Sequence, residues 1–364
     1  RMSPVLIGVL GYVVVQFVIG IVVARRVRTE DDYFVAGRRI GPTLSIATIF
    51  ATWFGAETCL GSAAEVHENG LTIFQAEPAA YGVCLILAGL LIAAPLWRRK
   101  LTTLADLYAE RYSPGVAKCA AALMIPTSML WAAAQIRGFG QVLVATSEFD
   151  IDVAVTIAAA LVIAYTAIGG MLADIVTDLV QGIALVIGLG AIGWVIVQKC
   201  GGFSATAENL AQSRVDFGVP AGKSWLDVVE AWSIPILGSI VAPELVARLS
   251  SARSAGVART SCLAGGTLYI VIGAIPIMIA LVAPALEGSI VAAADSEQFL
   301  PTLAQRHLPT FAYILFAGAL VSAILSTVDS NLLACSSALT NNIILPWRRK
   351  ATEPEKLHWA RAAT

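Results

Sequence analysis

Apolar residues occur along this chain in blocks of about twenty or more, which is the length that crosses a bilayer as an α-helix. Short polar or basic segments separate these blocks, and no soluble domain or low-complexity linker is visible. We therefore expect one transmembrane domain over residues 1–364. The pattern predicts nine spanning helices, at 2–24, 45–64, 71–97, 115–147, 152–169, 173–198, 225–247, 257–284 and 309–346.

Composition supports a membrane protein and argues against other classes. Hydrophobic residues make up 57% of the chain and charged residues only 13%, about half the usual charged share of a soluble domain. The net charge of −1 gives no basic field for nucleic acid. No HExxH or GxSxG motif is present, and the cysteines are scattered singly, so neither an enzyme nor a metal site built from cysteine and histidine is expected.

The distribution of lysine and arginine predicts how the chain is oriented. Most basic residues outside the spans fall in every second loop, and the alternate loops hold four, Lys199, Arg214, Lys223 and Arg306. Because cytoplasmic loops carry the excess of basic residues, the N-terminus is expected outside and the C-terminus in the cytoplasm of a cell (inner) membrane. The basic loops are those around 25–39, 98–111, 248–259 and 348–361, and the external loops at 199–224 and 285–308 are long enough for short interfacial helices.

Two of the predicted spans contain residues that interrupt a helix. The span at 45–64 has Gly55 within a polar stretch, and the span at 225–247 has Pro235 and Pro243, each of which removes a backbone donor. Ordinary kinks are the alternative, since glycine and proline are common in membrane helices. Broken helices in matching positions of two halves instead predict a binding site at the breaks.

The positions of the breaks predict an internal repeat. With the helix at 2–24 set aside as peripheral, the broken helices are the first and sixth of a core. That spacing is typical of two five-helix repeats of inverted topology. The repeats would be 45–198 and an incomplete 225–364, and the segment from 356 looks like the start of a further helix.

The last span carries the strongest candidate chemistry. Asp329 lies at membrane depth, with the hydroxyls of Ser326, Thr327 and Ser330 at helical spacing around it. A stripe of small hydroxyl residues is often only a packing surface between helices. A buried carboxylate is costly unless it is used, and sodium is a hard cation that prefers about five or six oxygen ligands. The span is therefore predicted to contribute to a sodium site.

Three motifs in this chain resemble those of the sodium:solute symporter family. They are the segments 31–39, 169–181 and 322–337, and the stretches at 51–53, 131–134 and 326–330 are similar to its choline-transporter branch, with likeness also to the sodium/proline permeases. The resemblance implies an all-α membrane protein with a LeuT-type five-helix inverted repeat preceded by one extra helix. The last core helices would be missing from this chain.

The resemblance also implies which residues bind sodium. The main site would take backbone carbonyls and two hydroxyls from Ala51, Phe54, Ala323, Ser326 and Thr327. A second site would use Asp178, Asp329 and Ser330, with both carboxylates ionised around a cation. Asp329 protonated, or bonded to threonine or asparagine neighbours, is the alternative. Many members have a hydroxyl where Asp329 stands, so one or two sodium ions per cycle both stay open.

Aromatic and charged residues near the first break predict the class of solute. The expected solute-binding residues are Trp53, Glu57, Tyr81, Trp131 and Arg137. The rings resemble part of the aromatic cage of the choline branch, which has a further tryptophan where this chain has Ala242. Glu57 and Arg137 are expected to pair or to bind a charged end of the solute, although Arg137 could instead snorkel to the outer interface. These features favour a small cationic or zwitterionic solute, such as an amino acid or a betaine-like compound, over choline.

The function predicted is sodium-coupled symport of that solute by alternating access, with the lipid bilayer as surroundings. Two other functions stay open: a symporter-like sensor module of a signalling protein, and a non-transporting membrane subunit. The identity of the solute, the protein partners and the oligomeric state do not follow from the sequence.

Overall fold

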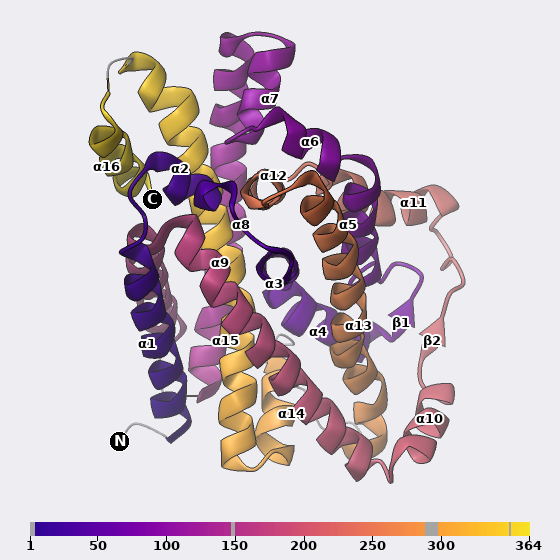
Figure 1. The fold of residues 1–364 in the computed structure, drawn as a ribbon. Helices are drawn as coiled ribbons and strands as arrows, with labels where there is room; N and C mark the ends of the chain where they lie inside the picture. The colour runs from indigo at the N-terminus through magenta and orange to yellow at the C-terminus, as the bar shows by residue number, and fades with distance from the viewer. Residues whose placement is uncertain (1–3, 147–149, 288–297, 349–350) are drawn as a thin grey trace.

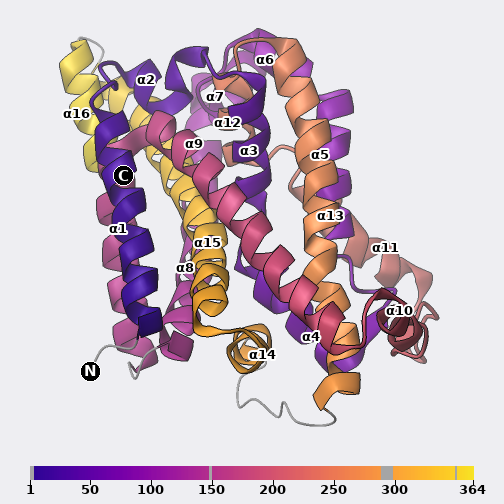
Figure 2. The ribbon, with the colours of Figure 1, turned by 60° about the horizontal axis from the view of Figure 1, so that its bottom comes forward.

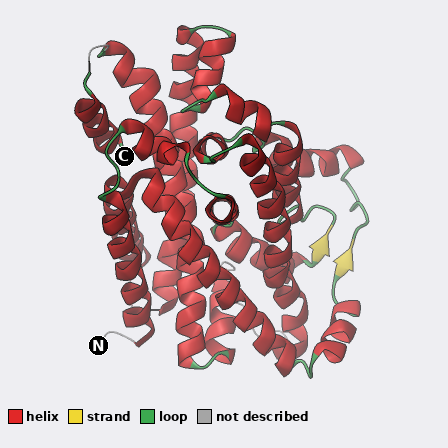
Figure 3. Cartoon of the chain, viewed as in Figure 1, coloured by secondary structure: helices red, strands yellow, loops and turns green. Residues whose placement is uncertain are grey.

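The computed structural model describes residues 4–146, 150–287, 298–348 and 351–364 as a bundle of helices (Figure 1). The described strands are two short ones, β1 (Leu71–Thr72) and β2 (Val215–Asp216), which pair in parallel at one edge of the bundle (Figure 3). The spans are packed at different tilts, and the two chain ends lie at opposite ends of the bundle (Figure 1).

Within the described residues, five helices are long and apolar enough to cross a bilayer, and three bent helix pairs raise the number to as many as eight. The long helices are α1 (Pro4–Ala24), α8 (Pro114–Thr146), α9 (Ile151–Lys199), α13 (Ala255–Glu287) and α15 (Thr310–Ala338). α15 continues through a π-helical turn, Leu339–Ile344, and a 3₁₀ turn, Leu345–Trp347. The expected span at 152–169 is the first part of α9, where the apolar stretch Ile151–Ala164 is shorter than the others.

α9 is broken at Gly170, where the sequence predicts the end of one span and the start of the next. Gly170 has φ 62° and ψ −176°, a conformation that disfavours residues with a side chain. A Cβ there would lie 2.6 Å from the ring of Tyr33, so the position also lacks room for one. The second part of α9 then runs diagonally across the bundle towards α10 (Phe203–Ala211) (Figure 1).

The two helices expected to break do so. α3 (Pro42–Trp53) is followed by a π-helical turn, Glu57–Gly61, and α4 (Ser62–Asn69), with a bend of 60°. α11 (Trp225–Ser233) continues in a π-helical turn, Ile234–Gly238, and is bent by 40° from α12 (Pro243–Ser251). Pro243 is the first residue of α12, where the lack of an amide hydrogen costs nothing.

The prediction of one continuous helix at 71–97 was wrong in its bounds and in its continuity. Residues 71–72 form β1, and the helix begins only at α5 (Ala79–Leu91), which a 58° bend separates from α6 (Ala93–Arg99). The apolar run extends through both parts, so hydropathy alone does not reveal the bend.

The basic segments gather at one end of the bundle. That end holds α2 (Glu30–Val35), the 3₁₀ turn Ala36–Arg38, α7 (Leu104–Arg111) and α16 (Glu353–Ala363), at the top of Figure 1. The guanidinium of Arg38 donates to the carbonyls of Lys100, at 2.9 Å, and Leu101, at 3.2 Å, and so joins two of the basic loops.

The opposite end holds α10 and α14 (Phe299–His307), seen at the lower side of Figure 2. The two long loops predicted on that side, 199–224 and 285–308, thus each contain a helix. Residues 288–297 of the second loop lie outside the described part, and so do residue 147, the last of the predicted span 115–147, and the two residues after it.

The sequence analysis counted Arg248 among the basic residues of a loop, and the structure shows that this was wrong. It lies on α12 with 1% of its surface exposed and is the largest of the fully buried side chains. Since an unpaired buried charge is costly, this position requires partners in the core.

Candidate ion and solute site

The break after α3 changes the hydrogen bonds of its last turn. The amide of Gly55, which would complete the helical bond to the Ala51 carbonyl, donates instead to the Trp53 carbonyl at 3.0 Å. The next amide, that of Ala56, donates to Oε1 of Gln135 on α8 at 2.8 Å. The carbonyl of Ala51 therefore loses its helical donor at the break. The hydrogen bond to Gln135 stabilises this non-helical turn.

α15 contacts the break through its hydroxyls. Oγ1 of Thr327 lies 3.0 Å from the carbonyl oxygen of Thr52 and 3.1 Å from that of Ala323, and its proton can go to either. Ser326 Oγ donates to Oδ1 of Asp178 on α9 at 2.5 Å. A hydroxyl that gives its proton to a neighbour keeps its lone pairs for a cation.

The residues predicted for the main sodium site thus lie on two elements that meet. Ala51 and Phe54 are buried at the end of α3, with 2% and 0% exposure. Ala323, Ser326 and Thr327 are buried on the facing side of α15. Oxygen atoms from an interrupted helix and from a neighbouring helix are typical of sodium sites in transporters of this architecture.

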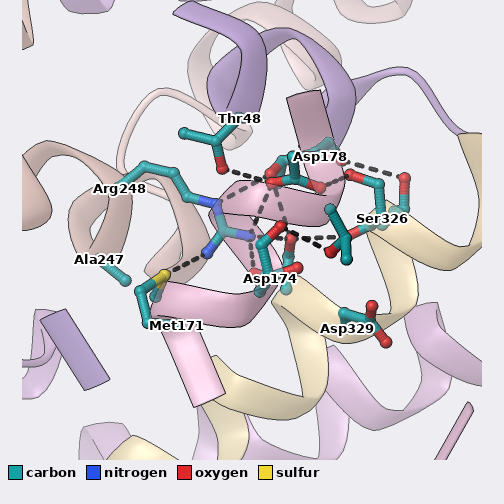
Figure 4. A network of polar contacts seen from close by, with 12 residues as sticks. Thr48, Met171, Asp174, Asp178, Ala247, Arg248, Ser326 and Asp329 are labelled. Atoms are coloured by element: carbon teal, nitrogen blue, oxygen red, sulfur yellow. Dashed lines mark hydrogen bonds and ion pairs between the residues drawn. The ribbon is translucent and has the colours of Figure 1, made fainter. Parts of the chain in front are cut away.

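Arg248 forms the centre of a buried polar network that the sequence analysis missed (Figure 4). Its Nε donates to Oγ1 of Thr52 at 2.9 Å, and its Nη1 lies 2.8 Å from Sδ of Met171. Its Nη2 donates to the carboxylate of Asp174 and to the hydroxyl of Ser330. One side chain therefore joins α3, α9, α12 and α15.

This network occupies part of the predicted second sodium site. Nη2 of Arg248 lies 3.6 Å from Oδ2 of Asp178, in addition to its bond with Ser330. Asp329 accepts a hydrogen bond at Oδ1 from Thr166, at 2.5 Å, and lies apart from the guanidinium (Figure 4). The structure therefore brings Asp178 and Ser330 together around a protein cation, with Asp329 beside them.

A cavity of about 640 Å³ lies between the two breaks. Of the predicted solute-binding residues, four line it: Trp53, Glu57, Tyr81 and Trp131. Thr327 of the candidate sodium site lines the same cavity, so the two candidate sites are adjacent. Ala242, where the sequence predicts a missing aromatic wall, also lines it.

Arg137 does not belong to this cavity. It is an exposed residue of α8, and its side chain is not part of the lining. The structure therefore does not place it beside Glu57, as the sequence analysis expected.

The charged residues in the cavity lining are both acidic. Glu57 enters from the first break and Glu244 from the second, and among the described lining residues there is no lysine, arginine or histidine. Glu244 was not among the solute-binding residues predicted from the sequence, although a carboxylate next to Pro243 in a broken span was an available signal. A lining of carboxylates and aromatic rings favours a positively charged ligand.

Comparison with known proteins gives the class of this chain. The model of the sodium:solute symporter family matches residues 33–364. High-affinity choline transporter 1 of Drosophila melanogaster is 27% identical over 352 residues, covering 92% of this chain and 55% of the relative. The human high affinity choline transporter 1 is 26% identical, covering 96% and 64%. The sodium/proline symporter of Escherichia coli is 24% identical, covering 98% and 74%.

A solved structure confirms the fold. A Na⁺-coupled sialic acid symporter, in a substrate-bound outward-open state, matches with a TM-score of 0.85 at 19% identity, covering 98% of this chain and 77% of that one. The predicted all-α fold of LeuT type is therefore correct.

The chain belongs to the sodium:solute symporter family and is a multi-pass membrane protein. The family and these relatives are transporters and not enzymes. The chain spans between 55% and 64% of the length of the choline transporters that it matches.

Proposed function

We propose that this chain forms the sodium- and solute-binding part of a sodium-coupled symporter for a small cationic solute. Sodium would bind between the break after α3 and the hydroxyls of α15. Holding these two elements together closes one access path and completes the cavity wall at Thr327. Ion and solute then bias the same conformational equilibrium, so the sodium gradient drives solute uptake.

One observation carries this proposal. The carbonyl of Ala51 loses its helical donor at the point where Thr327 of α15 reaches the neighbouring Thr52 carbonyl, 3.0 Å away. A carbonyl without a donor in a buried site is costly unless another partner satisfies it. A sodium ion would satisfy it and link the two helices.

Ser326→Ala is expected to raise the sodium concentration for half-maximal uptake by at least about tenfold, because the small cation loses an oxygen ligand. Uptake into proteoliposomes at varied sodium concentration measures this. Ser336→Ala is the matched control, since this serine lies on the same helix and, among the described residues, its hydroxyl bonds the Leu333 carbonyl alone, at 3.1 Å. Sodium-independent uptake by the unsubstituted protein would contradict the proposal.

The solute class follows from the cavity. Two carboxylates and four aromatic residues line the cavity, whereas the expected basic partner, Arg137, does not; the aromatic residues are Trp53, Tyr81, Tyr108 and Trp131. A cationic solute fits this lining better than a zwitterion that needs a positive partner for its carboxylate. With Ala242 in place of a further ring, the cage is open on one side, which supports an amine larger or less symmetric than choline.

Trp53→Ala is expected to weaken solute binding about 30-fold, since the loss of a desolvated cation–π contact costs about 2 kcal/mol. Tyr81→Phe keeps the ring and should weaken binding much less. Counterflow uptake with a library of amines, amino acids, betaine, choline and neutral sugars identifies the solute and measures both variants. Tightest binding of choline, or transport of a neutral sugar, would show that the cavity has been misinterpreted.

The sequence also leaves open two other functions, a solute sensor and a non-transporting membrane subunit. They differ in that solute would bind without being moved, so accumulation in proteoliposomes separates them from a symporter. The proposed orientation in a cell (inner) membrane, with the N-terminus outside and the basic end in the cytoplasm, rests on the lysine and arginine distribution.

A further inference from the structure

Two buried carboxylate oxygens near the break in α9 have no hydrogen-bond partner among the described residues. They are Oδ1 of Asp174 and Oδ2 of Asp329. Asp174 is 3% exposed and Asp329 is 0% exposed, so water at the surface does not reach them. Because buried polar atoms are nearly always satisfied, two orphaned oxygens in one place point to a ligand.

Both residues line one small space in the core. The other residues around it are Thr166, Gly169, Gly170 and Ala173. The space is too small for a water molecule, so water cannot separate or solvate the two carboxylates. Two ionised carboxylates that share a dry site repel each other, so the site favours either a proton on one of them or a cation between them.

The protein supplies only part of that charge. Arg248 contacts Asp174, but through Oδ2, the oxygen on the other side of the carboxylate. Asp329 has no ion-pair partner within the described part of the chain, and its Oδ1 receives only the hydroxyl proton of Thr166, at 2.5 Å. One guanidinium among Asp174, Asp178 and Asp329 leaves this end of the network negative.

The backbone adds to the negative potential. The first part of α9 ends at the break at Gly170, and the last residues of that part line the same space. The carbonyls at a helix C-terminus carry partial negative charge and favour a cation. Ends of interrupted helices are a recurrent source of sodium ligands in transporters.

We propose that Asp174 and Asp329 bind a dehydrated sodium ion, with the Thr166 hydroxyl and the end of the first part of α9 completing the oxygen shell. A bare sodium ion is smaller than a water molecule and prefers oxygen ligands of this kind. This site differs from the expected second site, because it uses Asp174 and Thr166 in place of Asp178 and Ser330, where Arg248 already supplies the positive charge. The inference rests on the proposed sodium coupling and adds a second ion to it.

The test is the number of sodium ions bound by the purified full chain, measured with radioactive sodium at saturation. The unsubstituted protein should bind two ions. Thr166→Val and Asp174→Asn should each lower the affinity for one of them by at least about tenfold, since each removes an oxygen ligand. Thr156→Val is the matched control, because this exposed threonine of α9 also bonds the carbonyl four residues before it and should leave both ions bound.

The outcomes separate this inference from the proposed function. Loss of one ion in Thr166→Val, with both ions kept in Ser330→Ala, supports the site. Loss of one ion in Ser330→Ala but not in Thr166→Val overturns it in favour of the site at Asp178 and Ser330. An unsubstituted protein that binds a single ion, lost in Ser326→Ala, keeps the symporter and overturns the second site. A protein that binds no sodium overturns both. If Asp174→Asn does not fold, the site is tested with Thr166→Val alone.

Discussion

Arg248→Ala is expected to destabilise the folded protein by about 3–5 kcal/mol, because it removes one partner of a buried ion pair and leaves the other charged. Asp174 would lose the one cation that contacts it within the described part of the chain, and Thr52 and Ser330 would lose a charged donor. These partners come from three other elements, so the loss affects packing around the candidate sodium site as well as stability. Denaturant unfolding of the purified protein in detergent measures the change.

Arg259→Ala is the control for this experiment, since Arg259 is an exposed arginine on α13. It should unfold as the unsubstituted protein does. Arg248→Lys should fall between the two, because an ammonium keeps the charge but cannot reach several partners as a planar guanidinium does. Removal of both partners, in Arg248→Met with Asp174→Leu, should recover part of the loss. Equal unfolding of Arg248→Ala and Arg259→Ala would mean that the network does not stabilise the fold.

The local signals in the sequence were sufficient for most of the spans and for the two breaks at the candidate site. Apolar blocks identify the spans, and Gly55, Pro235 and Pro243 mark the breaks, because glycine and proline act on the backbone of their own helix. The π-helical turn at Ile234–Gly238 and the start of α12 at Pro243 follow that prediction closely. The bend between α5 and α6 at Ile92 was missed, although Pro95 lies three residues further on and lacks the amide that would bond the Leu91 carbonyl.

Contacts between distant segments could not be predicted in this way. Arg248 counts as a loop residue when only its position after an apolar block is considered. Its burial depends on carboxylates that lie 74 and 70 residues earlier in the chain, Asp174 and Asp178, and on Ser330, 82 residues later. Arg137 is the reverse case, because the sequence analysis expected it among the solute-binding residues, whereas it is exposed on α8 and does not line the cavity.

The resemblance to the family supplied the candidate sodium-site residues, and the structure adds the contacts that position them. Gln135 was within a predicted span but had no assigned role. Its side chain accepts the amide hydrogen of Ala56 at 2.8 Å and so stabilises the open turn of α3. A polar residue in an apolar span was the available signal, yet the sequence does not tell which helix it faces.

The close approach at this turn predicts a large effect for Gly55→Ala. A Cβ at Gly55 would lie 2.6 Å from Oε1 of Gln135 and 3.0 Å from Oγ1 of Thr327. Gln135 would have to move, which leaves the buried amide of Ala56 without its acceptor, at a cost of about 1–3 kcal/mol. Thr327 would be pushed away from the Thr52 carbonyl, so the proposed sodium site loses its geometry.

We therefore expect Gly55→Ala to lower the sodium affinity about 100-fold or more, which corresponds to about 2.7 kcal/mol, while the protein still folds. Sodium-dependent uptake and sodium binding to the purified protein measure the affinity. Gly61→Ala is the matched control in the same broken span, because a Cβ there meets only Cγ of Glu57, at 4.0 Å. If both variants bind sodium as the unsubstituted protein does, the ion does not lie at the junction of α3 and α15. If Gly55→Ala loses sodium affinity and Gly61→Ala keeps it, the close contact of Gly55 with Gln135 and Thr327 is what sets the geometry of the site.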